Sequence, residues 1–193
     1  MEKFKLVSPT IEYEEQAIEF IKEHYEHNPN VLHIHGGASI SKYVDDYAGW
    51  LQKLENDRAT IANEERVPAE TYFLIRISDN RIIGTISIRL ELNDHLRKFA
   101  GHIGFGIRPT ERKKGYNRIN LFLALLECQK RNIDKVMLTC DKENIASSKT
   151  MIGLGGVFET EFYDEDAGDF TQIYWIDVNE AIKNNMERFK PYI

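Results

Sequence analysis

The sequence has few cysteines and lacks any long apolar run. Cysteine occurs only at Cys128 and Cys140, which is too few for a disulfide-dense scaffold and unlike the CxxC spacing of zinc or redox sites. No uninterrupted apolar stretch approaches the roughly 18 residues of a membrane-spanning helix. The first residues also lack the apolar segment of a secretory signal peptide. We therefore expect two reduced thiols in a soluble, cytoplasmic protein with no membrane partner.

Basic residues are in the minority as well. The chain has 25 Lys and Arg against 31 Asp and Glu, a net charge of −6. Nucleic acids and anionic membranes attract basic surfaces, so neither is an expected partner. Apolar residues make up 42% of the chain and charged residues 29%, as in folded globular proteins. With 193 residues and no repeat or linker, residues 1–193 are predicted to form a single domain.

Hydrophobic periodicity predicts an α+β, or mixed α/β, fold with helices flanking one central sheet. Strands are expected at 3–7, 71–78, 82–92, 101–107, 136–140, 157–163 and 169–176. Helices are expected over 10–27 and 41–57, after the basic turn near 116, and within 141–154.

Positive charge is concentrated in one segment, residues 107–117, which reads IRPTERKKGYN. It holds four cationic residues and one acid between the end of a strand and the start of a helix. Free N–H groups at a helix N-terminus bind anions, and Gly115 allows the backbone to approach a phosphate closely. A phosphorylated ligand is one interpretation, and a solvated basic turn is the other.

Two common nucleotide motifs are absent from this region. Gly115 is followed by Tyr116 and Asn117, whereas a Walker A loop needs Lys and then Ser or Thr. A dinucleotide fingerprint would need a third glycine where Pro109 stands.

The run Ile107-x-Pro109-x-x-Arg112-x-x-Gly115-x-Asn117 resembles the acetyl-coenzyme A pyrophosphate loop of the GCN5-related N-acetyltransferases (GNAT), written V-x-P-x-x-[RQ]-x-x-G-x-[GA]. Asn117 replaces the final glycine or alanine. Residues 141–156 resemble the second cofactor segment of the family, in which an asparagine and small residues open a helix along the pantetheine arm. The resemblance extends in element order over about residues 70–176.

The resemblance implies a central mixed, mostly antiparallel sheet of about seven strands. Strands 101–107 and 136–140 would be a splayed parallel pair, with a bulge on the first, and acetyl-coenzyme A would lie between them without a metal. The implied cofactor-binding residues are Phe105, Gly106, Ile107, Arg112, Lys113, Lys114, Gly115, Tyr116, Asn117, Asn144, Ser147 and Ser148.

The resemblance also implies direct transfer in a ternary complex, in which a deprotonated amine attacks the thioester. His102 stands where some members have a catalytic glutamate, and Glu91 is the second candidate for general base. The family's thiolate-protonating tyrosine would be at 151, where this chain has Met151, and a thioether donates no proton. Ser148 or a water would then serve, or the thiolate would leave unassisted.

Histidines and aromatic residues of the N-terminal region allow two interpretations each. His24, His27, His33 and His35 lack a recognised ligand spacing with cysteine or carboxylate, so a metal site is disfavoured. The segment 33–37 instead fits the acceptor pocket. Three large aromatic residues follow in the predicted helix, and their helical spacing favours core packing over a place in that pocket: Tyr43, Tyr47 and Trp50.

The sequence thus predicts an N-acetyltransferase that moves an acetyl group from acetyl-coenzyme A to a primary amine. The acceptor would be a small molecule or a peptide, and the enzyme a possible homodimer, as is common in the family. A non-catalytic acyl-coenzyme A sensor or interaction module is the alternative, favoured by Met151 and Asn117. A nucleotide-phosphate-binding domain of another family is a third, more distant interpretation.

Overall fold

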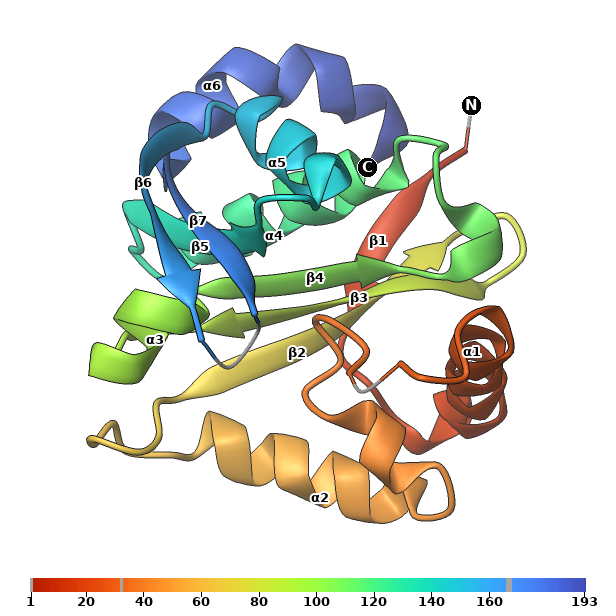
Figure 1. Cartoon of the computed structure of the whole chain (residues 1–193). Coiled ribbons are helices and arrows are strands. Elements are labelled where there is room, and N and C mark those ends of the chain that lie inside the picture. The colour runs from red at the N-terminus through yellow and green to blue at the C-terminus, as the bar shows by residue number, and fades with distance from the viewer. Residues whose placement is uncertain (1, 32, 166–167) are drawn as a thin grey trace.

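The computed structural model describes residues 2–31, 33–165 and 168–193. Its strands are β1 (Phe4–Val7), β2 (Ala69–Arg76), β3 (Arg81–Arg89), β4 (Ile103–Ile107), β5 (Lys135–Asp141), β6 (Val157–Asp164) and β7 (Asp169–Asp177). Its α-helices are α1 (Glu14–His27), α2 (Tyr47–Arg58), α3 (Asp94–Phe99), α4 (Tyr116–Lys130), α5 (Ile145–Ile152) and α6 (Val178–Phe189). Figure 1 shows α4, α5 and α6 on one side of the strands and α1 and α2 on the other. The predicted α+β class and all seven predicted strands are confirmed.

The strands form two sheets where one was expected. The first has the order β1-β2-β3-β4 and the second β5-β7-β6, and every ladder within them is antiparallel. Between β4 and β5 the described residues form one isolated bridge, Gly101 with Leu138, which is antiparallel. The expected parallel pair therefore forms no ladder here, because the two strands meet only at that end.

The expected bulge on β4 is also absent. Residues 103–107 pair with 84–88 of β3 in unbroken register. The irregularity lies instead between Leu74 and Ile75, where β2 faces β3. β4 is thus a regular edge strand.

Two apolar clusters cover the two faces of the first sheet. One joins Ile86 and Ile88 of β3 to Leu121 and Phe122 of α4. The other joins β2 and β3 to helices α1 and α2, and Trp50 is completely buried within it. Core packing of the aromatic residues in this region is confirmed for Tyr47 and Trp50, which are both buried; Tyr43 packs against the same cluster and is partly exposed.

The sequence analysis missed helices α3 and α6. Both begin with a side-chain cap: Asn93 accepts a hydrogen bond from the Leu96 N–H at 3.0 Å, and Asp177 from the Glu180 N–H at 2.9 Å. In α6, buried apolar residues such as Val178 and Ile182 follow the cap at helical spacing. The combination of an acidic cap and this spacing was the available signal for α6.

Both cysteines are free and buried, as predicted. Burial raises the pKa of the Cys128 thiol to about 12 and that of Cys140 to about 11, so both stay protonated near neutral pH. No helix in the described part of the chain combines the length and apolarity needed to cross a bilayer.

Candidate active site

One edge of β4 is left without a partner strand. Arg108 N–H donates to the Ile83 carbonyl at 2.8 Å. In an antiparallel ladder such bonded pairs recur at every second residue, so the backbone groups of Gly104 and Gly106 also face β3. Those of Phe105 and Ile107 then face away from β3, toward β5. We call the space between these two strands the cleft.

The facing edge of β5 is arranged in the same way. Lys142 N–H donates to the Phe170 carbonyl of β7 at 2.7 Å, so the backbone groups of even-numbered β5 residues are used within the second sheet. The backbone groups of Thr139 and Asp141 point instead into the cleft. Two open strand edges thus face each other. This arrangement suits an elongated ligand that is rich in amide groups.

His102 closes one end of the cleft. The backbone N–H of His102 donates to the Met137 carbonyl at 2.7 Å, and the ring Nδ1 of His102 accepts from the Met137 backbone N–H at 2.9 Å. Because Nδ1 is an acceptor, the neutral ring carries its proton on Nε2. Gly101 beside it has a φ of +66°, and a Cβ there would lie 2.4 Å from the Met137 carbonyl oxygen. The backbones therefore approach this closely only with glycine at 101.

Burial, together with the nearby positive charges of Arg97 and Arg89, lowers the pKa of His102 to about 4. The ring does not line the cavity described below, and its acceptor nitrogen is occupied. Its assignment as general base stays a prediction, and these contacts favour a structural role.

Replacement of His102 separates the two roles. His102→Asn keeps an acceptor near the Nδ1 position but removes any general base. We therefore expect the acetyl transfer predicted from the sequence to persist in this variant. His102→Leu leaves the Met137 N–H unpaired and should lower the free energy of unfolding by about 1–3 kcal/mol. Activity assays and urea denaturation measure both; inactivity of a stably folded His102→Asn would restore the catalytic assignment.

The same variants predict a pH dependence of stability. The folded protein keeps His102 neutral down to about pH 4, whereas the unfolded chain protonates it near pH 6.5. This contribution to stability is complete above about pH 6.5 and is lost as the pH falls toward 4, by up to roughly 3 kcal/mol. We expect a smaller loss over that range in His102→Asn, measured by urea denaturation at pH 7.5, 5.5 and 4.5.

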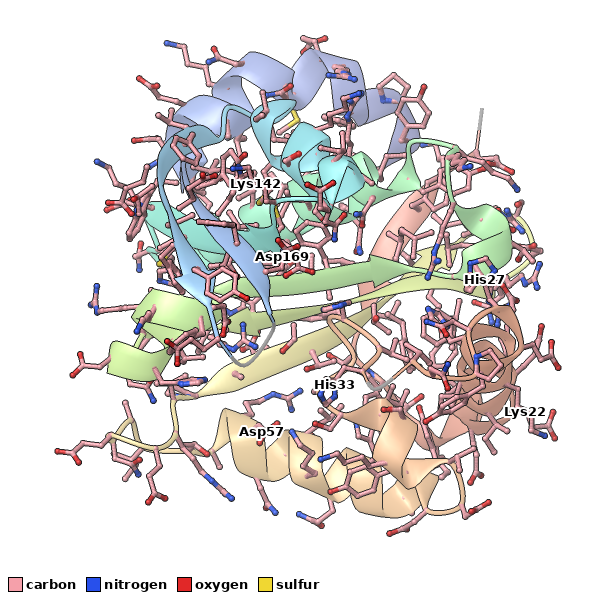
Figure 2. All side chains as sticks on the ribbon, in the orientation of Figure 1. Lys22, His27, His33, Asp57, Lys142 and Asp169 are labelled. Carbon is pink, nitrogen blue, oxygen red and sulfur yellow. The ribbon has the colours of Figure 1, made fainter. Side chains whose placement is uncertain are left out.

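A cavity of about 400 Å³ opens along the cleft. Residues from several separate parts of the chain line it: the loop 33–39, the end of β3, Phe99 and Ala100, the strands β4 and β5, and the start of α5. Asp164 and Thr171 of the β6–β7 hairpin complete the wall. Figure 2 labels His33 on the side of α1 and α2, and Lys142 and Asp169 on the side of β5–β7, so both sides of the molecule contribute to this region.

Glycines let the loop 33–39 lie directly on β3 and β4. Gly36 has a φ of +74°, and a Cβ there would meet the carbonyl oxygens of Gly104 and Thr85, both at 2.7 Å. The Thr85 hydroxyl donates to the His35 carbonyl at 2.9 Å, which fixes the loop in place. The sequence analysis expected segment 33–37 to form part of the acceptor pocket, and in the structure this segment lies beside the cavity.

Two neighbouring glycines of β4 should respond differently to alanine. At Gly106 a Cβ would lie 2.7 Å from the His35 carbonyl oxygen, so Gly106→Ala must displace the loop. At Gly104 the nearest atom, Gly36 N, is 3.4 Å away, an ordinary contact. We expect a loss of roughly 1–3 kcal/mol of stability for Gly106→Ala and little for Gly104→Ala, measured by urea denaturation. Equal losses would contradict this loop position.

The basic loop, residues 108–115, leads from β4 to α4. Gly115 caps α4 with a φ of +84°, and a Cβ there would meet nothing. Among the described residues, the backbone N–H groups of 113–117 have no hydrogen-bond partner. The amide oxygen of Asn117 is buried, so this side chain does not cover the free groups. The loop and helix start thus present several free donors and a positive dipole end, as an anion requires.

Ion pairs with other parts of the protein fix the basic loop in place. Arg108 is fully buried, and its guanidinium lies 3.2 Å from the Glu19 carboxylate and 3.4 Å from that of Glu23. Glu111, also buried, pairs with Lys114 at 2.7 Å and with Arg76 at 3.1 Å. These carboxylates neutralise part of the loop's charge.

The remaining cations of the loop are more available. Arg112 donates through Nε to the Ile107 carbonyl at 3.2 Å, and Lys113 is exposed. The described residues give Lys113 no ion pair. The Tyr116 hydroxyl is bonded to Glu2. Lys113 is therefore the side chain of the loop most free to meet a ligand.

The start of α5 contributes to the cavity. The Asn144 side chain caps the helix by accepting from the Ser147 N–H at 3.1 Å, and both residues line the cavity. Ser148 is buried and donates to the Ile145 carbonyl at 3.2 Å. Met151 lies completely buried in the core. Of the two serines predicted to meet the cofactor, Ser147 therefore has the more direct access.

Other predicted residues lie apart from the cavity. Glu91 is exposed in the bend after β3 and does not line it. His24 is buried on α1, where its Nδ1 lies 2.8 Å from the Phe20 carbonyl oxygen. In the described ranges no three His, Cys, Asp or Glu side chains group as metal ligands.

The sequence analysis missed Arg89, Thr139 and Asp141, which line the cavity. Arg89 and Asp141 end their strands and Thr139 lies within β5. These positions gave no signal, because the cavity forms only where two sheets meet.

Comparisons with known proteins agree with this geometry. The acetyltransferase (GNAT) domain profile matches residues 18–157. No curated protein matches the sequence. Among solved structures, Mycobacterium smegmatis RimJ in complex with CoA-disulfide is 14% identical with a TM-score of 0.70, and the match covers 97% of this chain and 92% of that one.

Two further structures show the same likeness. The microcin C7 self-immunity acetyltransferase MccE, in complex with acetyl-CoA and AMP, is 16% identical over 91% of this chain and 92% of that one, with a TM-score of 0.67. A Salmonella typhimurium acetyltransferase that modifies the N-terminal serine of the ribosomal protein L7/L12 is 13% identical over 91% and 95%, with a TM-score of 0.66. At such identities the likeness establishes the fold. With the family profile matching most of its length, the chain belongs to the GNAT acetyltransferase family.

Proposed function

We propose that the protein transfers an acetyl group from acetyl-coenzyme A directly to a primary amine. The observation that carries this proposal is that β4 links two regions of free backbone groups. Its residues 103–105 line the cavity, and after Ile107 the strand runs directly into the loop whose N–H groups at 113–117 are free. One elongated ligand with amides along its length and a diphosphate at its end would satisfy both regions.

The cofactor would be bound mainly by backbone groups. Free N–H groups of Phe105 and Ile107 would meet the amides of the pantetheine arm, and those of 113–117 the pyrophosphate, with Lys113 adding charge. Asn144 and Ser147 would flank the arm from α5. MccE, whose structure holds acetyl-CoA, and RimJ, whose structure holds CoA-disulfide, share the fold and support this choice.

The transfer itself needs a proton acceptor in the cavity wall. The amine nitrogen would attack the thioester carbonyl carbon, the C–S bond would break, and the amine's proton would pass to a base while coenzyme A leaves as a thiolate. His35 lines the cavity, unlike His102 and Glu91. Burial lowers its pKa, an effect that nearby Asp141 partly offsets, so the ring is neutral near pH 7. We assign the proton-accepting role to His35.

A calorimetric titration tests the cofactor. We expect acetyl-coenzyme A, and neither ATP nor NAD, to bind with a micromolar Kd. Lys113→Glu should weaken binding about tenfold by reversing one charge near the pyrophosphate. Lys183→Glu, the same change at an exposed position of α6, should leave the Kd unchanged. Binding of ATP as tight as that of acetyl-coenzyme A would exclude the proposal.

The proton acceptor can be tested once an amine is turned over. His35→Gln should lower kcat by roughly 100-fold or more without changing the Kd for acetyl-coenzyme A. Because the neutral ring is the active form and its pKa is lowered, wild-type kcat should stay constant down to below pH 6.5 and then fall. An unchanged kcat in His35→Gln would mean that another group or water takes the proton.

A sensor that binds acyl-coenzyme A without turnover is the second candidate. The buried Met151, in place of a tyrosine proton donor, favours it. Tight cofactor binding combined with no coenzyme A release across a broad amine panel would support the sensor over the enzyme.

A further inference from the structure

Arg89 stands at the end of the cavity that lies farthest from the basic loop. It ends β3 and pairs in register with Ala69 of β2, and its N–H donates to the His102 carbonyl at 2.8 Å. The basic loop begins after Ile107, at the other end of β4. Five residues of extended strand place the two regions roughly 17 Å apart. The diphosphate of a cofactor held by the basic loop is therefore not the partner of Arg89.

The side chain of Arg89 shares a face of the first sheet with Thr85. Alternate residues of a strand point to the same side, so Thr85 and Arg89 both face the loop 33–39, to which the Thr85 hydroxyl is bonded. Gly104 of the neighbouring strand adds no side chain there and lines the cavity. This face lies beside the free strand edge, and the space next to Arg89 remains for a second ligand.

In the described part of the chain, no acidic side chain compensates the charge of Arg89. Its one side-chain hydrogen bond among the described residues runs from Nη1 to the Gly101 carbonyl at 3.0 Å. No carboxylate of the described residues lies within 4.0 Å of its guanidinium. Burial alone lowers its pKa, and no acidic neighbour opposes that effect.

Three other shielded arginines differ in this respect. Arg108 is paired with two carboxylates, and Arg76 and Arg131 likewise contact carboxylates. For Arg89, partial withdrawal from water without a counter-charge is unfavourable, and within the described ranges four of its five N–H donors have no partner. An anion that enters the cavity would supply the missing counter-charge and accept hydrogen bonds from these donors.

The other charged groups of the cavity occupy different positions. Asp141 ends β5 and partly offsets the lowering of the His35 pKa that burial causes. Arg97, an exposed residue of α3, acts on His102, as Arg89 does. Arg89 and Arg97 thus place two positive charges near His102. Asp141 and Asp164 also line the cavity, and neither lies within 4.0 Å of the Arg89 guanidinium.

We propose that Arg89 binds an anionic group, a carboxylate or a phosphate, of the acceptor, and so selects amines that carry such a group. The inference rests on the proposed acetyl transfer and narrows its substrate class. A planar guanidinium can bind either anion through two parallel hydrogen bonds. Arg89 is a specificity-determining residue in this scheme, and the proton transfer remains with other groups.

The test uses pairs of amines that differ in the anion. Each amino acid is compared with its carboxamide, for example serine with serinamide and phenylalanine with phenylalaninamide, and O-phosphoethanolamine with ethanolamine. Coenzyme A release gives kcat and KM for each. We expect the anionic member of at least one pair to be preferred by about 10- to 100-fold in kcat/KM, mainly through KM. The carboxylate and phosphate pairs show which anion fits.

Variants at position 89 locate that preference. Arg89→Gln keeps a donor for the Gly101 carbonyl and should abolish the preference, while Arg89→Lys, which keeps the charge but loses the planar fork, should retain part of it. Arg58→Met, at an exposed position of α2, is the control. Melting temperature and the Kd for acetyl-coenzyme A should stay close to wild type in Arg89→Gln, which separates acceptor binding from a structural role.

Each outcome bears on one claim. Equal use of charged and uncharged amines by wild type, or a preference that persists in Arg89→Gln, overturns the role of Arg89 and leaves acetyl transfer standing. If no amine of the panel is turned over, the result counts against the transferase. In that case calorimetry with serine and O-phosphoethanolamine on the coenzyme A-saturated protein still tests Arg89, and absence of Arg89-dependent binding overturns the inference.

Discussion

The paired hydrogen bonds between His102 and Met137 are the junction on which the site depends. They join the two sheets at one point, and β4 and β5 separate beyond it. If pairing continued along both strands, their facing N–H and C=O groups would be used up and no cleft would exist. The left-handed conformation of Gly101 and the buried, neutral state of His102 both serve this local contact. A single junction thus creates two open edges for ligand binding.

The distribution of charge supports a division of tasks along β4. At one end, Glu19, Glu23 and Glu111 neutralise Arg108 and other cations, which fixes the basic loop, while the backbone N–H groups of 113–117 stay free among the described residues. At the other end, the half-buried Arg89 has no carboxylate partner among the described residues. Buried charge is normally paired within the protein. Arg89 departs from this pattern, and it stands in the wall of the cavity, on the face where the proposed acceptor would enter.

Glycine has two separate uses in this site. At Gly36 and Gly106 the absence of a Cβ lets the loop 33–39 and β4 come into backbone contact. At Gly104 it leaves space instead, since a Cβ there would make only an ordinary contact. The first use is structural and the second gives the cavity its depth, although the residue type is the same.

Much of the fold and the cofactor loop could be predicted from the sequence, because the signals are local. Hydrophobic patterns in the sequence predicted all seven strands and four of the helices. The run from Ile107 to Asn117 indicated the start of an anion-binding helix. Helices α3 and α6 have local caps too, and were missed. The division into two sheets, the role of His102 and the exposure of Arg89 to the cavity depend on contacts between distant segments. Residues 89, 102 and 137 are brought together by sheet packing, which leaves no periodic trace in the chain. The sequence by itself determined the elements and the ligand class; the tertiary structure decided which polar groups are satisfied and which remain free to bind.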